Sequence, residues 1–155
     1  MATLQCAPMS GVVVSVQICP GQREPMRVVP EAQLDPGGIR GDRHFAPGSA
    51  RQLLMIEAET LARFGLEPGQ VKENVTTSGV DLMSLAPGTR LALGAAEVEL
   101  ADECHPCSRM DEIRSGLMLE LEGSRGMLAK VVRPGRVRPG DPVRVLERAE
   151  PEVVG

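Results

Sequence analysis

The sequence predicts a mainly β fold: a barrel with a few short helices on its periphery. The 17 glycines and 13 prolines among 155 residues imply many turns between short elements. Strands do not alternate regularly with helices, which argues against a doubly wound α/β sheet. A chain of this length fits one domain. We expect that domain at residues 11–147, with flexible tails at 1–10 and 148–155.

The strands are predicted by short apolar or β-branched runs that end at Gly or Pro. We expect them at 11–19, 26–34, 51–56, 71–77, 89–93, 96–101, 125–133, 137 and 142–146. Pro30 interrupts 26–34, which predicts an edge strand or two short pieces. The runs 89–93 and 96–101 flank Gly94-Ala95 and predict a hairpin. A loop at 39–50 precedes the third strand.

Two helices are predicted. Glu57 opens a short one, which Gly65 can end in a left-handed conformation. The second is expected to run without a break over 108–122, with Ser108 and Asp111 as a loose form of the capping box. Its apolar residues recur at helical spacing: Met110, Ile113, Leu117 and Leu121.

Composition excludes some classes of partner. The net charge is −4 and the aromatic residues are Phe45 and Phe64, with no Trp or Tyr. Nucleic-acid-binding domains need a basic surface, and many need several stacking rings, so we expect no nucleic-acid partner. Residues 1–11 have no basic region and no apolar stretch long enough for a signal peptide, and the sequence has no apolar run of about 18 residues. We therefore expect no membrane association and a cytoplasmic protein, with its four cysteines as reduced thiols.

The segment Cys104-His105-Pro106-Cys107 precedes the second predicted helix. Cys107 would stand one residue outside the helix, where the dipole favours a thiolate. A dipole contributes roughly 0.3–1 kcal/mol, less than the about 1.4 kcal/mol of one pKa unit. Arg109 and His105 would have to provide the rest of the stabilisation.

The cysteines also have three other interpretations. A buried cysteine that only packs is the ordinary case, but two cysteines and a histidine within four residues make it less favoured. An all-cysteine zinc site would need Cys6 and Cys19, which lack close spacing. A thioredoxin-like dithiol should follow a strand in a βαβ unit, and the surrounding sequence does not have that pattern.

Three polar groups have both a structural and a functional interpretation. The first lies in the polar strand at 71–77 and comprises Lys72, Glu73, Asn74, Thr76 and Thr77. The second is the loop 41–44, GDRH, where Asp42 can secure a turn or contact a ligand. The third comprises Arg133, Arg136 and Arg138, which fit an anion site or, more simply, a solvated face.

In order along the chain, seven segments resemble the MOSC domain, the family related to the C-terminal domain of molybdenum cofactor sulfurase. The resemblance covers about residues 11–146 and implies a β-rich, barrel-like fold. The segments are GVVVSV, GIRGDRH, RQLLMIEAETL, KENVTTSGVDL, LALGAAEVEL, HPCSRM and GMLAKVVRPGRVRPGDPVRV.

The resemblance implies that Cys107 is the functional thiol. It would either carry sulfur as a persulfide or bind molybdenum of the pterin cofactor, and both roles need a thiolate. By the same resemblance Asn74, Thr76 and Thr77 would line the pocket and hydrogen-bond oxo or phosphate oxygens. Arg109, His44 and Arg43 are weaker candidates for binding the anion.

Two departures from the family pattern matter. Lys72 stands where relatives often have glycine, which affects the turn or the charge of the pocket. Cys104 is an additional thiol that can resolve a persulfide on Cys107 by forming a disulfide. The pyridoxal-phosphate domain of the sulfurase does not fit in 155 residues, so a separate cysteine desulfurase or molybdenum enzyme is the expected partner.

The resulting hypothesis is a stand-alone MOSC domain that binds sulfur or the molybdenum cofactor at Cys107, in sulfur transfer or cofactor handling. A first alternative is a molybdenum-cofactor-dependent reductase of N-hydroxylated compounds. A second is a thiol–disulfide module that uses Cys104 and Cys107, and an interaction role is the fallback. Without Trp or Tyr, a pterin would have no large ring to stack on, which favours a small oxygen-rich or sulfur-bearing ligand.

Overall fold

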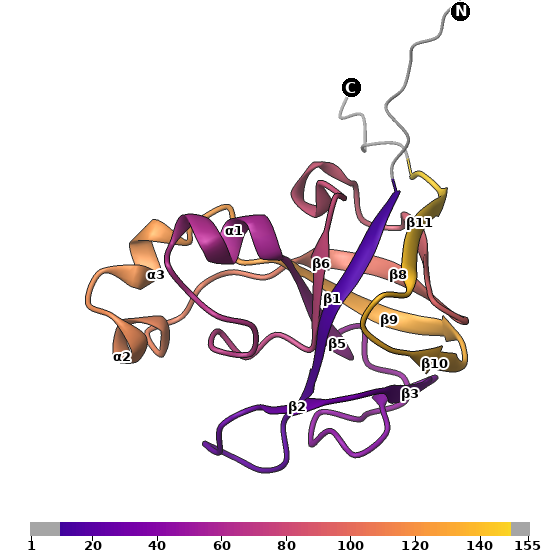
Figure 1. Cartoon of the computed structure of the whole chain (residues 1–155), viewed down its shortest axis with the longest axis horizontal. Helices are drawn as coiled ribbons and strands as arrows, with labels where there is room; N and C mark the ends of the chain where they lie inside the picture. The colour runs from indigo at the N-terminus through magenta and orange to yellow at the C-terminus, as the bar shows by residue number, and fades with distance from the viewer. Residues whose placement is uncertain (1–9, 150–155) are drawn as a thin grey trace, which may run out of the picture.

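The computed structural model describes residues 10–149, and the chain forms a closed β-barrel of seven strands (Figure 1). Around the barrel the order is β11-β7-β8-β9-β5-β6-β1, and pairing of β1 with β11 closes it. All neighbouring strands are antiparallel except β5 and β6, which are parallel. The barrel strands are β1 (Ser10–Ile18), β5 (Leu53–Glu57), β6 (Val75–Ser78), β7 (Arg90–Leu93), β8 (Ala96–Glu103), β9 (Met127–Arg133) and β11 (Pro142–Glu147).

The remaining strands extend the barrel at one end. β2 (Arg27–Val29) pairs with the end of β1, and a separate small sheet has the order β10-β3-β4. Its strands are β3 (Ala32–Asp35), β4 (Gly38–Ile39) and β10 (Gly135–Val137). The division of 26–34 into two short pieces, one on each side of Pro30, is therefore confirmed, as is the hairpin of β7 and β8.

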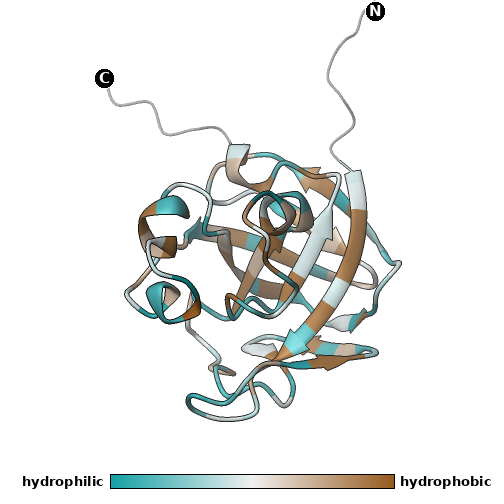
Figure 2. Ribbon diagram, turned by 60° about the vertical axis from the view of Figure 1, so that its left-hand side comes forward, coloured by the Kyte–Doolittle hydropathy of each residue, from teal (hydrophilic) through white to brown (hydrophobic). Residues whose placement is uncertain are grey.

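Aliphatic side chains fill the barrel. Along β8 the buried residues Ala96, Val98 and Leu100 alternate with partly exposed ones, the period expected of a strand with one face in the core. Figure 2 shows this alternation of hydropathy along the strands. Neither phenylalanine belongs to the barrel core, so the fold is built as its composition requires, without large rings.

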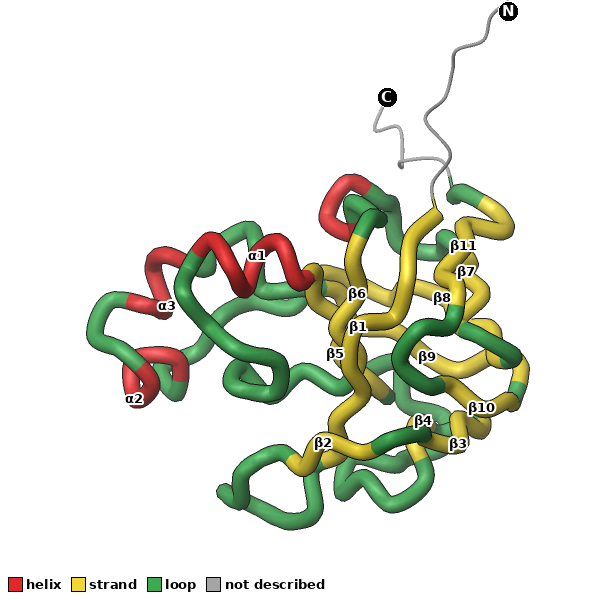
Figure 3. Tube along the Cα trace, viewed as in Figure 1, coloured by secondary structure: helices red, strands yellow, loops and turns green. Residues whose placement is uncertain are grey.

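The helices gather on one side of the barrel, as Figure 3 shows. They are α1 (Ala58–Arg63), α2 (Met110–Ile113) and α3 (Leu117–Glu120), with a 3-10 turn at Leu82–Ser84. A second apolar cluster holds them together and includes Leu61, Val71, Met110, Leu117 and Leu121. The longest helix has six residues, and no helix within 10–149 has the length and apolarity of a membrane span.

The prediction of one continuous helix over 108–122 is wrong. Arg114 is extended, with φ −158° and ψ 132°, and Gly116 adopts φ 87°, so α2 and α3 are separate single turns. The Arg114 guanidinium donates to the Phe64 carbonyl at 2.7 Å and to Glu120. These contacts stabilise the break. The N-cap of α2 is Arg109 without a side-chain bond, so the capping box at Ser108 is also wrong.

Three further expectations can be compared with the structure. The strand expected at 71–77 begins only at Val75, because the preceding residues form a turn with Lys72 at φ 71°. Gly65 follows α1 at φ 69°, which confirms the left-handed end. The tails expected at 1–10 and 148–155 fall largely on residues 1–9 and 150–155, which lie outside the described residues.

Candidate functional site

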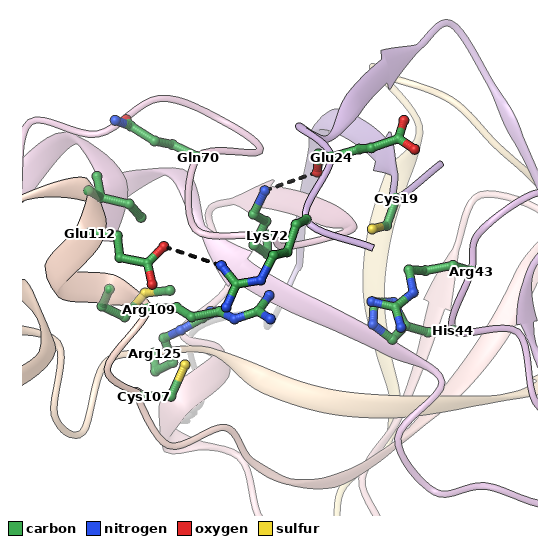
Figure 4. A pocket seen from close by; sticks show the side chains of 13 residues that line it. Cys19, Glu24, Arg43, His44, Gln70, Lys72, Cys107, Arg109, Glu112 and Arg125 are labelled. Atoms are coloured by element: carbon green, nitrogen blue, oxygen red, sulfur yellow. Dashed lines mark hydrogen bonds and ion pairs between the residues drawn. The ribbon is translucent and has the colours of Figure 1, made fainter. Parts of the chain in front are cut away.

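A cavity of about 430 Å³ lies between the barrel and α2. Its walls come from the loop after β1 (19–24), the loop after β4 (43–44), the turn before β6 (70–72), the segment 107–113 and Arg125 just before β9. These segments are distant in sequence, and Figure 4 shows their side chains facing a common space. The volume is within the usual range for small-molecule sites.

The cavity is strongly cationic although the chain has a net charge of −4. Five of its lining residues are Arg or Lys and two are Glu. Arg23 lies 4.0 Å from Glu112, and Lys72 Nζ donates to the Glu24 carbonyl at 3.1 Å. That lysine bond is to a backbone oxygen, so Lys72, like Arg43, Arg109 and Arg125, has no ion pair among residues 10–149. The cavity therefore favours an anionic ligand.

Cys107 lines this cavity and is exposed. Its carbonyl accepts a hydrogen bond from Met110 N at 2.9 Å, in the turn that leads into α2. Because α2 has only four residues, the helix dipole expected to stabilise the thiolate is too small to matter. His105 does not line the cavity but lies 3.8 Å from Glu122 and 4.0 Å from Glu103. The cationic residues that line the cavity together with Cys107 include Arg109 and Arg125 instead.

Arg125 is the functional candidate that sequence reasoning missed. It is 5% exposed, and its Nη2 donates to the Val71 carbonyl at 2.5 Å, while Nε and Nη1 have no partner within the described part of the chain. Burial lowers the pKa of this guanidinium, and the nearby Cys104, Glu73 and Cys107 oppose that shift. The only signal in the sequence is a lone arginine between Ser124 and Gly126 at the start of an apolar strand.

Glu73 is the buried acid beneath the same wall. Its Oε2 accepts from Gly69 N at 2.8 Å and from Thr76 Oγ1 at 2.9 Å, while Oε1 has no partner. Burial raises the pKa of this carboxyl, and the hydrogen bonds and Arg125 partly oppose the rise. Glu73 thus secures the turn before β6.

The structure gives the predicted pocket residues Asn74, Thr76 and Thr77 internal positions. Asn74 accepts from Leu54 N at 3.0 Å and donates to the Gln17 carbonyl at 3.2 Å. Thr76 is fully buried and donates to Glu73, and Thr77 is fully buried with no partner for its Oγ1. None of the three lines the cationic cavity.

A second cavity, of about 190 Å³, is lined by Cys104 and Asn74. It shares the side chains of His44 and Lys72 with the larger cavity. Cys104 is half-buried, and burial raises the pKa of its thiol against the opposing charges of Arg125 and Arg51. Cys104 and Cys107 are both free cysteines, and they line different cavities.

Asp42 holds the GDRH loop in place. Its Oδ2 accepts from His44 N at 2.9 Å and lies 3.2 Å from His44 Nδ1, while Oδ1 accepts from Cys19 N at 2.6 Å. Asn74 Nδ2 donates to the same Oδ1 at 3.2 Å. The buried carboxylate therefore positions the His44 ring, which lines both cavities. Arg43, between Asp42 and His44 in the sequence, lines the larger cavity.

The remaining candidate groups lie away from the cavity. Arg133 pairs with Glu97 at 3.2 Å and Arg136 with Glu31 at 3.0 Å, as on a solvated face. Within residues 10–149 no three His, Cys, Asp or Glu side chains gather as metal ligands. The zinc alternative also involves Cys6, which lies outside the described part of the chain.

The residues of the large cavity suit an anionic group that carries sulfur or a soft metal. A thiolate is the soft ligand such a metal prefers, and the unpartnered nitrogens of Arg125 are donors for negatively charged oxygen. Within residues 10–149, no Phe, Tyr or Trp lines this cavity, although the imidazole ring of His44 does. A planar ligand would therefore be held by guanidinium, imidazole and backbone groups.

Comparisons with known proteins agree with this architecture. Three solved structures share the fold: YuaD of Bacillus subtilis, YiiM of Escherichia coli and YiiM of Geobacillus stearothermophilus. For YuaD the identity is 24% and the TM-score 0.75, covering 88% of this chain and 96% of that one. The Escherichia coli YiiM is 20% identical with a TM-score of 0.70, covering 89% and 71%. The Geobacillus stearothermophilus YiiM is 18% identical with a TM-score of 0.72, and the match covers 88% of this chain and 75% of that one.

A search of curated proteins gave no match. The model of the MOSC domain family matches residues 40–144, which is more than half of the chain. That segment includes the GDRH loop, the turn before β6, Cys107 and Arg125. The chain belongs to the MOSC domain family.

Proposed function

We propose that this MOSC protein binds its ligand at Cys107, as persulfide sulfur or as the molybdenum cofactor, and acts in sulfur transfer or cofactor handling. One observation carries the proposal: an exposed thiol lines a cavity whose lining has five cationic residues and two glutamates. Thiolate is both the nucleophile and the metal ligand, and surrounding positive charge favours it over the thiol.

As a sulfur carrier, the Cys107 thiolate attacks the terminal sulfur of a persulfide on a cysteine desulfurase. A new S–S bond forms on Cys107, the S–S bond of the donor breaks, and the donor cysteine leaves as a thiolate. The exchange needs no external oxidant or reductant. Arg109 and Arg125 stabilise the negative charge on both the attacking thiolate and the product persulfide.

As a cofactor-binding protein, the same cavity would use Cys107 as the metal ligand, and Arg43, Arg109 and Arg125 to hold the anionic parts of the group. When bound, the cofactor supplies oxygen-atom and electron transfer, as the reductase alternative requires. The residues of this chain contribute binding, charge neutralisation and orientation. In the thiol–disulfide alternative, the disulfide would join Cys104 and Cys107, which are both free and line separate cavities.

The carrier role is tested by incubating the protein with a cysteine desulfurase and cysteine, followed by intact-mass and cyanolysis analysis. We expect a gain of one sulfur atom on Cys107, its loss in Cys107→Ser and its retention in Cys104→Ser. The same load on Cys107→Ser would exclude the carrier role. Metal analysis of protein made in a host that synthesises the cofactor tests the other role, which requires near-stoichiometric molybdenum that disappears in Cys107→Ser.

A further inference from the structure

Two nitrogens of a buried arginine beside Cys107 have no hydrogen-bond partner among residues 10–149. Arg125 lines the cavity at 5% exposure, and only its Nη2 is bonded, to the Val71 carbonyl. A buried charged group without partners is costly to a fold. A donor pair of this kind, retained in a cavity wall, points to an anion as its partner.

Arg109 adds a second guanidinium on the same wall. It is half-buried and has no ion pair among the described residues. Figure 4 shows Arg109, Arg125 and Cys107 together on one side of the cavity, with Cys19, Arg43 and His44 across from them. Of the two acidic residues of the lining, Glu112 lies 4.0 Å from Arg23, and neither Glu112 nor Glu24 forms an ion pair with Arg109 or Arg125 among residues 10–149. Neither acid neutralises this pair of arginines.

We propose that Arg125 and Arg109 form an oxyanion subsite beside Cys107, and that the sulfur donor used there is a small anion whose transferable sulfur is bonded to an oxyanion head group. The inference rests on the proposed function of Cys107 as a sulfur carrier. It adds the chemical class of the donor and assigns the two arginines to the head group.

The transfer is balanced without a further reactant. The Cys107 thiolate attacks the outer sulfur of the donor, and a Cys107 persulfide forms. The bond between that sulfur and the head group breaks, and its electron pair leaves with the head group as an oxyanion. Charge then grows on the oxygens that the guanidinium groups contact, so the arginines assist the departure as well as binding.

The test compares two sulfur sources on the whole protein. One arm uses thiosulfate as the probe, and the other uses a cysteine desulfurase with cysteine. In both arms, intact mass and cyanolysis measure the sulfur on Cys107, and release of sulfite is measured in the thiosulfate arm. We expect thiosulfate to load Cys107 with one sulfite released per sulfur bound, and inorganic sulfate to compete with the loading.

Two variants assign the head-group site, with Arg136→Gln as a matched control on the solvated face, where Arg136 pairs with Glu31. In Arg109→Gln and Arg125→Met, we expect the rate of thiosulfate loading to fall about tenfold or more relative to desulfurase loading. A hydrogen bond to a charged group contributes about that factor, and the oxyanion is present in the thiosulfate arm alone. Arg109 is partly exposed, so Arg109→Gln tests the subsite even where Arg125→Met does not fold.

The outcomes separate the two proposals. Loading by the desulfurase without loading by thiosulfate would overturn the subsite and leave the carrier role intact. Equal relative rates in the parent, Arg109→Gln and Arg136→Gln would also overturn it. Failure of both arms would overturn the carrier role and the subsite together.

Discussion

At the scale of single residues, burial opposes charge on both sides of the cavity wall. Glu73 is fully buried and its pKa is raised, whereas Arg125 is nearly buried and its pKa is lowered. The two form no ion pair within 4 Å among residues 10–149, although each partly offsets the pKa shift of the other. An unneutralised buried carboxylate should make folding stability depend on pH.

Glu73→Gln tests this coupling. The folded pKa of Glu73 is raised above 4.5, so its protonated form favours folding, and that contribution is lost as pH rises through the folded pKa. A neutral glutamine removes the loss, which for one group is at most about 1.4 kcal/mol per pH unit. We expect the free energy of unfolding, measured by urea denaturation from about pH 4.5 upward, to decline less steeply in the variant.

The control is Glu31→Gln, which removes a surface carboxylate that pairs with Arg136. It should keep the parent pH profile, because exposed pairs contribute little. An unchanged slope in Glu73→Gln would contradict a raised pKa of Glu73 in the folded protein.

At the scale of elements, the turn before β6 places the cavity residues 70–72. Its conformation depends on Lys72, which adopts φ 71° and donates its backbone N–H to the Gly69 carbonyl at 3.0 Å. Glycine adopts this left-handed region without the steric cost that a Cβ brings. Lys72 thus keeps a backbone conformation that glycine favours, and it adds a charge to the cavity.

Lys72→Gly and Lys72→Ala separate the side chain from the backbone. Both remove the bond from Nζ to the Glu24 carbonyl, but only glycine relieves the strain. The gain of roughly 1–2 kcal/mol is partly offset by the entropy of glycine in the unfolded chain. We expect the free energy of unfolding of the Lys72→Gly variant to be about 1 kcal/mol higher than that of the Lys72→Ala variant. Equal stabilities in urea denaturation would mean that the turn relaxes.

The break between α2 and α3 shows that helical periodicity in the sequence predicts which side chains are buried but not whether the helix is continuous. Met110, Leu117 and Leu121 are buried in one cluster, as their spacing predicts. The same spacing also predicted a continuous helix, which Arg114 and Gly116 interrupt. Periodicity reports which side chains are buried, whereas the contacts of Arg114 with Phe64 and Glu120 come from tertiary structure.

At the scale of the whole molecule, β1 closes the barrel, because it pairs with β11 on one side and with β6 on the other. Ser10 to Val12 pair with β11, and Val12 to Val16 pair with β6, with an irregularity between Val13 and Ser15. Gly11 lies where both neighbours approach. A Cβ there would overlap the Ser78 carbonyl oxygen and lie 3.0 Å from Val80 Cγ2.

Gly11→Ala should therefore disturb the pairing of β1 with β6. Since the overlap is with backbone, the strands must move apart, and we expect a loss of about 1–3 kcal/mol in free energy of unfolding by chemical denaturation. Ser10→Ala is the matched control, because Ser10 is exposed at the adjacent position of the same strand. Equal stability of the two variants would contradict closure through Gly11.

The sequence by itself determined the β-rich class, most of the strands and the aliphatic core, because these depend on local periodicity and turn residues. It also led to the prediction that Cys107 is the functional thiol. Only the tertiary structure brought Arg125 to Cys107, turned Asn74 and Thr76 inward, and divided Cys104 and Cys107 between two cavities. The physical reason is that a buried charge is defined by neighbours distant along the chain. Local sequence patterns carry no record of that proximity.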